Sequence, residues 1–122
     1  MIRDSNIIYR MNVVKKIKAE FNFLTESGFK LINCDIDEDD NFKSGFRIEY
    51  KNKEKGVRFT YGEYEFNIYF INNSRERSYL VIDYYLFNNN SGLAGNMFRV
   101  ENLESIISSV AIDIKQHYSS IL

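Results

Sequence analysis

The sequence has no proline and no tryptophan, and it has only one cysteine and one histidine in 122 residues. Without proline there is no polyproline segment and no proline kink. A single cysteine excludes an intramolecular disulfide, and Cys34 with His117 supplies too few ligands for a zinc site. We therefore expect no metal and no cofactor.

Long apolar runs are also missing. No run approaches the roughly 20 residues that cross a membrane, and residues 1–6 lack the start of a secretory signal. Sixteen Lys and Arg against seventeen Asp and Glu leave a net charge of −1, which gives no general reason to bind nucleic acid or an anionic membrane. With the single cysteine, these absences indicate a reducing, cytoplasmic compartment.

What the chain does have is aromatic residues and regular apolar spacing. Ten Phe and nine Tyr favour β-sheet, and the length suits one domain spanning residues 1–122. Residues 6–27 predict an amphipathic helix that ends at Gly28-Phe29, because glycine accepts the left-handed position after a helix. Its apolar stripe is Met11, Val14, Ile17, Phe21 and Leu24.

Five strands are predicted between residues 29 and 87. Alternating or continuous apolar patterns mark them at Phe29–Ile36, Phe46–Tyr50, Val57–Tyr61, Tyr64–Ile71 and Tyr79–Phe87. Gly62-Glu63 is predicted to form a two-residue hairpin turn with positive φ at glycine, and Asn72–Arg77 a charged turn.

A second helix is predicted from about Asn102 to the end of the sequence. Strands joined by short turns pair antiparallel, and two amphipathic helices can cover one sheet face. The fold class is therefore α+β: an antiparallel β-meander of about five strands with the N-terminal and C-terminal helices packed on one face. Gly92-Leu-Ala-Gly95 lacks the residues of a phosphate loop and is expected to be a connection.

The acidic run between the first two strands is the main candidate interaction surface. Its spacing does not fit a calcium loop, which needs glycine and glutamate at positions occupied here by other residues. A solvated loop and a docking surface for a basic partner both remain open, because closely spaced carboxylates set up a local negative field. The carboxylates are Asp35, Asp37, Glu38, Asp39 and Asp40.

The predicted fifth strand adds two further candidate partner-binding residues, Asp83 and Tyr85. Asp83 interrupts an apolar run, so its strand face is expected to be the open one and to carry an aromatic surface. Base stacking by the sheet aromatics is disfavoured by the neutral charge, and packing in the core is the expected alternative. No local signature makes Cys34 and His117 a nucleophile and its base.

The strand pattern also resembles a known family. Phe21–Phe29, Phe46–Tyr50, Val57–Tyr61 and the strand containing Glu65 resemble small bacterial immunity proteins encoded beside polymorphic or contact-dependent toxins. The resemblance covers residues 21–71 and implies a single-domain cytosolic protein that binds and blocks a toxin domain.

We therefore expect a non-catalytic binding protein rather than an enzyme. Its expected partner is a cognate toxin domain, for which a basic nuclease has suitable charge, and not nucleic acid or a membrane; the sequence also leaves room for a weak homodimer. The alternative is a small-molecule or peptide-binding module with an aromatic pocket between sheet and helices, which an enclosed cavity would indicate.

Overall fold

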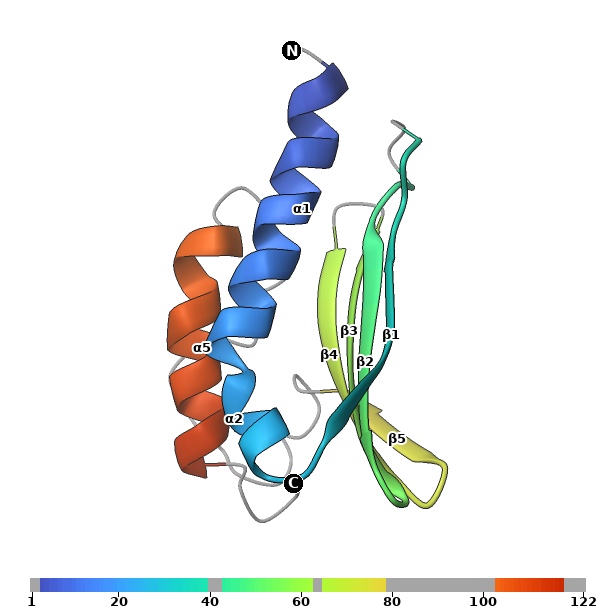
Figure 1. The fold of residues 1–122 in the computed structure, drawn as a ribbon, viewed down its shortest axis with the longest axis vertical. Coiled ribbons are helices and arrows are strands. Elements are labelled where there is room, and N and C mark those ends of the chain that lie inside the picture. The colour runs from blue at the N-terminus through green and yellow to red at the C-terminus, as the bar shows by residue number, and fades with distance from the viewer. Residues whose placement is uncertain (1–2, 40–42, 63–64, 79–102, 118–122) are drawn as a thin grey trace.

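The structure, a computed structural model, describes residues 3–39, 43–62, 65–78 and 103–117 (Figure 1). The helices are α1 (Arg3–Glu20), α2 (Asn22–Glu26) and α5 (Leu103–His117). The strands are β1 (Lys30–Ile36), β2 (Phe46–Asn52), β3 (Lys55–Gly62), β4 (Glu65–Asn72) and β5 (Arg75–Ser78).

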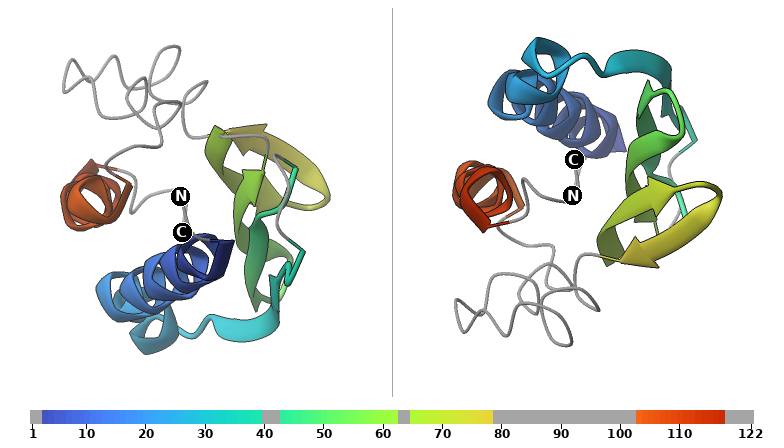
Figure 2. Two further views of the ribbon diagram at one scale, coloured as in Figure 1. Left: turned by 90° about the horizontal axis from the view of Figure 1, so that it is seen from above. Right: turned by 90° about the horizontal axis from the view of Figure 1, so that it is seen from below.

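The strands form one antiparallel sheet in the order β1-β2-β3-β4-β5. Each strand therefore pairs with the strand that follows it in the chain, as a meander requires. The helices α1 and α5 lie side by side on the same face of this sheet (Figures 1 and 2). The predicted α+β meander with helices on one face is confirmed.

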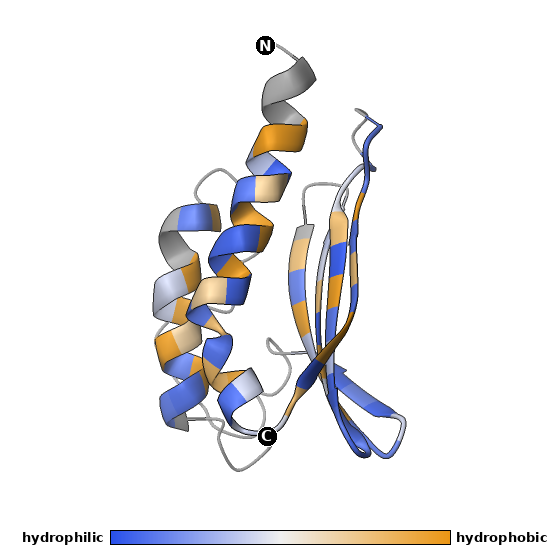
Figure 3. Cartoon of the chain, viewed as in Figure 1, coloured by the Kyte–Doolittle hydropathy of each residue, from blue (hydrophilic) through white to orange (hydrophobic). Residues whose placement is uncertain are grey.

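The core lies between the helices and the sheet. Alternate residues of β2, β3 and β4 point toward the helices, which gives the banded hydropathy of these strands in Figure 3. Phe59 is fully buried in the central strand, with its ring 4.7 Å from Phe21 in an edge-to-face arrangement. Burying one such side chain stabilises the fold by roughly 1.5–3 kcal/mol.

The predicted first helix is two helices, interrupted at Phe21. Gly28 has φ +99°, and the Phe29 N–H donates to the Leu24 carbonyl at 2.9 Å, so the predicted glycine stop is confirmed as a Schellman ending. The prediction for Met11 is wrong, because its side chain is 49% exposed. The buried stripe is instead Arg10, Val13, Val14, Ile17, Phe21 and Leu24.

A β-bulge in β1 changes the predicted faces of that strand. The register shifts between Leu31 and Asn33, so that Leu31 opposes Tyr50 and Cys34 opposes Ile48. Leu31 and Cys34 therefore share the helix-facing side, although simple alternation predicts opposite sides for them. The bulge is a local irregularity that an alternating pattern does not reveal.

Two predicted turns are placed differently. Gly62 pairs with Glu65 and therefore belongs to β3 rather than to the turn, and it is not in a positive-φ conformation. The segment predicted as a charged turn contains a two-residue turn at Asn73-Ser74, both with positive φ, followed by β5. The predicted strand Tyr79–Phe87 lies outside the described residues.

Candidate functional site

The acidic run leads out of β1 into loop 37–45, which joins β1 to β2 at one end of the sheet (Figure 1). Asp37 and Gly45 close the base of this loop with two hydrogen bonds of 2.9 Å. The Asp37 N–H donates to the Gly45 carbonyl, and the Gly45 N–H donates to Asp37 Oδ2. The carboxylate of Asp37 therefore has a structural role within the loop.

Arg10 of α1 anchors the same loop from the helix layer. Its side chain is buried, and Nη2 donates to the carbonyl oxygens of Asp37 and Asp39 at 2.8 and 2.9 Å. Nε is also buried and has no hydrogen-bond partner among the described residues. The guanidinium thus holds the loop by its backbone, and Nη2 is not used to neutralise carboxylates.

The other described acidic side chains at the end of β1 and in the loop stay exposed. Asp35, Glu38 and Asp39 are solvent-exposed, and their carboxylates form no ion pair within the described ranges. Arg47, which lies opposite Asp35 in the register, donates instead to Glu49 at 2.7 Å. The loop therefore presents several unneutralised carboxylates on an anchored backbone.

Three of the predicted binding residues, Asp40, Asp83 and Tyr85, lie outside the described residues. The structure therefore brings together Asp35, Asp37, Glu38 and Asp39, without relating them to the predicted fifth strand. Sequence reasoning did not identify Arg10 as part of this site. The available signal was a charged residue at the helical spacing of the buried stripe, four residues before Val14.

Cys34 is half-buried on the helix-facing side of β1, next to Tyr50. Burial raises the pKa of Tyr50, and the neighbouring Cys34 thiol raises it further. His117 is the last residue of α5. In the part of the chain that the structure describes, no group of three or more His, Cys, Asp or Glu side chains is arranged to hold a metal.

The sheet face opposite the helices is largely polar over the described residues, and the aromatic surface predicted around Asp83 and Tyr85 lies outside them. Arg58 donates to Glu76 at 2.6 Å and stacks over Tyr69, with its Cζ 4.8 Å from the ring centroid. The hydrogen bond raises the pKa of Arg58 and lowers that of Glu76. The neighbouring aromatics Phe59 and Phe66 instead point into the core.

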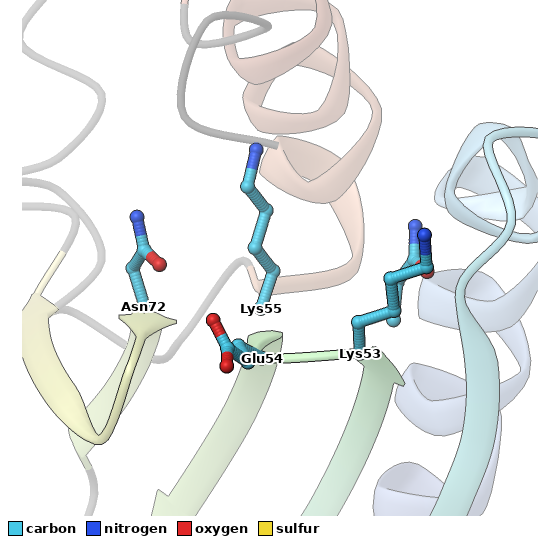
Figure 4. A pocket seen from close by; sticks show the side chains of 5 residues that line it. Lys53, Glu54, Lys55 and Asn72 are labelled. Carbon is cyan, nitrogen blue, oxygen red and sulfur yellow. The ribbon is translucent and has the colours of Figure 1, made fainter.

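The opposite end of the sheet from loop 37–45 is basic. Residues 51–55 and 75–77 carry five basic and two acidic side chains. An open depression there is lined by Asn52, Lys53, Glu54, Lys55 and Asn72, and the lysine side chains project from the strand ends (Figure 4). The net charge of the protein is near zero, but the two ends of the sheet carry charge of opposite sign.

A second open depression lies between α1–α2 and α5, beside Phe23 and Ile112. Neither of these two depressions is an enclosed cavity. Among the described helices, none is long and apolar enough to cross a membrane. Comparison of the chain with protein-family models, curated proteins and solved structures finds no match.

Proposed function

We propose that this protein is a non-catalytic binding protein, of the immunity type, that neutralises a cognate toxin domain by occupying it. The observation that supports this most directly is the anchored acidic loop. Arg10 holds the backbone of Asp37 and Asp39, while the carboxylates of Asp35, Glu38 and Asp39 remain exposed. Such a loop offers fixed negative charge to a basic partner.

The anchoring matters because binding costs conformational entropy. A loop that is already held by a buried arginine loses less freedom on association than an untethered one. Its exposed carboxylates also attract a basic surface over about one Debye length, which is roughly 8–10 Å at physiological salt. These properties suit fast, tight capture of a basic enzyme such as a nuclease.

The small-molecule alternative receives less support. The two depressions formed by described residues are open to solvent, whereas a ligand pocket encloses most of its ligand. Described residues between sheet and helices, such as Phe59 and Ile68, are fully buried. A buried apolar core with an exposed charged loop is an arrangement that suits a protein-binding scaffold.

Co-expression with the toxin tests the proposed function. The partner to use is the variable C-terminal domain of a secreted protein encoded beside this gene, expressed at a level that stops growth. We expect growth to be restored and the two proteins to co-purify. Absence of both rescue and complex for such a domain would contradict the immunity function.

A charge-neutralised loop tests the docking surface. The substitutions Asp35→Asn, Glu38→Gln and Asp39→Asn leave the structural carboxylate of Asp37 in place. We expect association at low salt to slow by roughly tenfold and its salt dependence to flatten, because electrostatic steering is lost.

The matched control removes the same number of charges elsewhere on the surface. Glu20→Gln, Glu26→Gln and Glu54→Gln replace accessible carboxylates away from the loop and should change the association rate far less. Equal association rates for the two triple variants would show that loop 37–45 is not part of the interface with the toxin domain.

A further inference from the structure

The strand β1 is an edge of the sheet with an accessible outer side. It pairs only with β2 among the described strands, so its other row of backbone N–H and C=O groups faces outward. Two apolar side chains at this edge are also exposed, Leu31 by 44% and Ile32 by 56%. An unpaired edge with exposed apolar side chains is suited to accept another strand.

The bulge gives this edge an unusual symmetry. Lys30 and Asp35 oppose Lys51 and Arg47 on the open face, whereas Leu31 and Cys34 oppose buried residues on the helix-facing side. In a regular strand, residues five or three positions apart point to opposite faces. Because Ile32 is one extra residue, Lys30 and Asp35 lie on the same face of β1, and Leu31 and Cys34 lie together on the other face.

We propose that two copies of the protein associate through antiparallel pairing of β1 with β1. The twofold register places Lys30 of each copy opposite Asp35 of the other, and Leu31 opposite Cys34. Each contact occurs twice, as the symmetry of an isologous dimer demands. Opposite charges meet on the open face, and apolar side chains meet on the helix-facing side.

Charge complementarity is the reason to choose a second copy as the occupant of this edge. Lys30 and Asp35 lie on one face of the strand, at positions that the twofold axis places opposite each other. The strand is therefore complementary to itself in charge in this register. The ladder is short and has the bulge at its centre, so the dimer is weak and forms at high protein concentration. The proposal does not rest on the proposed function. The two share Asp35, but Lys30 belongs only to the dimer contact, so the Lys30 variant separates dimerisation from toxin binding.

Charge reversal with rescue tests this register. Lys30→Asp places like charges opposite each other at both symmetric contacts, and so does Asp35→Lys. We expect each single variant to raise the dimer dissociation constant by about tenfold in sedimentation equilibrium, because two favourable pairs become unfavourable. The double variant Lys30→Asp/Asp35→Lys restores the pairing and should dimerise like the unmodified protein.

Arg75→Glu in the far edge strand β5 is the matched charge reversal and should leave dimerisation unchanged. Circular dichroism of every variant checks that it is folded. A protein that stays monomeric up to about 1 mM would overturn the proposal. The same dimer dissociation constant in both single variants and in the double variant would also overturn it.

Oxidative cross-linking provides a second test with the native cysteine. Leu31→Cys places a thiol opposite Cys34 of the other copy, within the Cα separation of roughly 4.4–6.8 Å that a disulfide requires. We expect a covalent dimer on mild oxidation, and none when Cys34→Ser is added. A covalent dimer that forms equally well with Ile36→Cys in place of Leu31→Cys would contradict the register.

Discussion

At the scale of single residues, Gly45 determines how closely loop 37–45 approaches β3. A Cβ atom added at this position would lie 1.5 Å from the Tyr61 carbonyl oxygen, so no side chain fits without moving backbone. From this position the Gly45 N–H donates to the carboxylate of Asp37 at 2.9 Å. One glycine thus links the geometry of the acidic loop to that of the sheet.

Gly45→Ala should therefore destabilise the protein strongly. We expect a loss of about 3 kcal/mol or more in the free energy of unfolding measured with urea, because the backbone of β2 or β3 must shift. Gly56→Ala is the matched control, since its added Cβ would meet its nearest neighbour at 3.3 Å. Similar losses for the two variants would show that the close approach at Gly45 is unimportant.

Residue-level roles could be predicted from the sequence only where they are local. The Gly28-Phe29 helix ending depends on neighbouring residues, and it was predicted correctly. The role of Gly45 depends on Tyr61, sixteen positions away, and Arg10 contacts carbonyl groups more than 25 positions away. No pattern within a short window contains that information.

At the scale of elements, Arg10 connects α1 to loop 37–45 through two hydrogen bonds. It is a buried cation whose described partners are neutral carbonyl groups, so its desolvation is only partly compensated. The same contact fixes the loop that we propose as the docking surface. Helix α1 therefore supports the candidate site as well as the core.

Arg10→Met should loosen the loop more than it destabilises the fold. Loss of both hydrogen bonds is expected to cost about 1–3 kcal/mol, and relief of the buried charge partly offsets this loss. Hydrogen exchange at Asp37 and Gly45 should accelerate, while exchange at Ile48 and Phe59 should change little. Lys15→Met, on the exposed side of α1, is the control. Equal acceleration in the loop and in the central strands would contradict a local anchoring role.

The elements themselves were predictable to differing degrees. Strands β2 and β3 follow clean alternation because one face is buried and the other is polar. The faces of β1 were not predictable, since the bulge interrupts its alternation. Strand β5 begins within a charged segment that resembles a turn, because both of its described faces are hydrophilic.

At the scale of the whole molecule, Tyr9 lies where the helices and the sheet meet. It belongs to α1, and its phenol oxygen accepts a hydrogen bond from the backbone of Leu103 at the start of α5. Burial, and then the neighbouring Tyr61 and Glu104, raise the pKa of Tyr9 from 10.0 to about 12 despite that hydrogen bond. The neutral phenol is therefore favoured in the folded protein.

The raised pKa predicts an alkaline loss of stability. Between pH 10 and about 12 the unfolded chain releases the Tyr9 proton before the folded protein does, so the free energy of unfolding falls as pH rises. Tyr9→Phe should show a shallower fall across this range in urea titrations. Tyr69→Phe, on the open face, is the control and should retain the steeper fall. Parallel curves for Tyr9→Phe and the unmodified protein would contradict this assignment.

The fold could be predicted further than the site. The periodicity of apolar residues determines helix or strand, and short connections determine antiparallel neighbours, which together define the meander. The acidic run was also visible in the sequence. Its anchoring, the charge separation between the two sheet ends and the ion pairs on the open face depend on contacts between distant segments, so they became apparent only in three dimensions.

The packing of α1 against α5 has a consequence for protein synthesis. Helix α1 leaves the ribosome well before its helical neighbour α5, which begins more than 80 residues further along the chain, whereas β2, β3 and β4 each follow their neighbour directly. Hairpins can therefore close while translation continues, but the buried stripe of α1 stays partly uncovered until α5 has emerged. During that interval the nascent chain presents an apolar helix face on which a ribosome-associated chaperone can act.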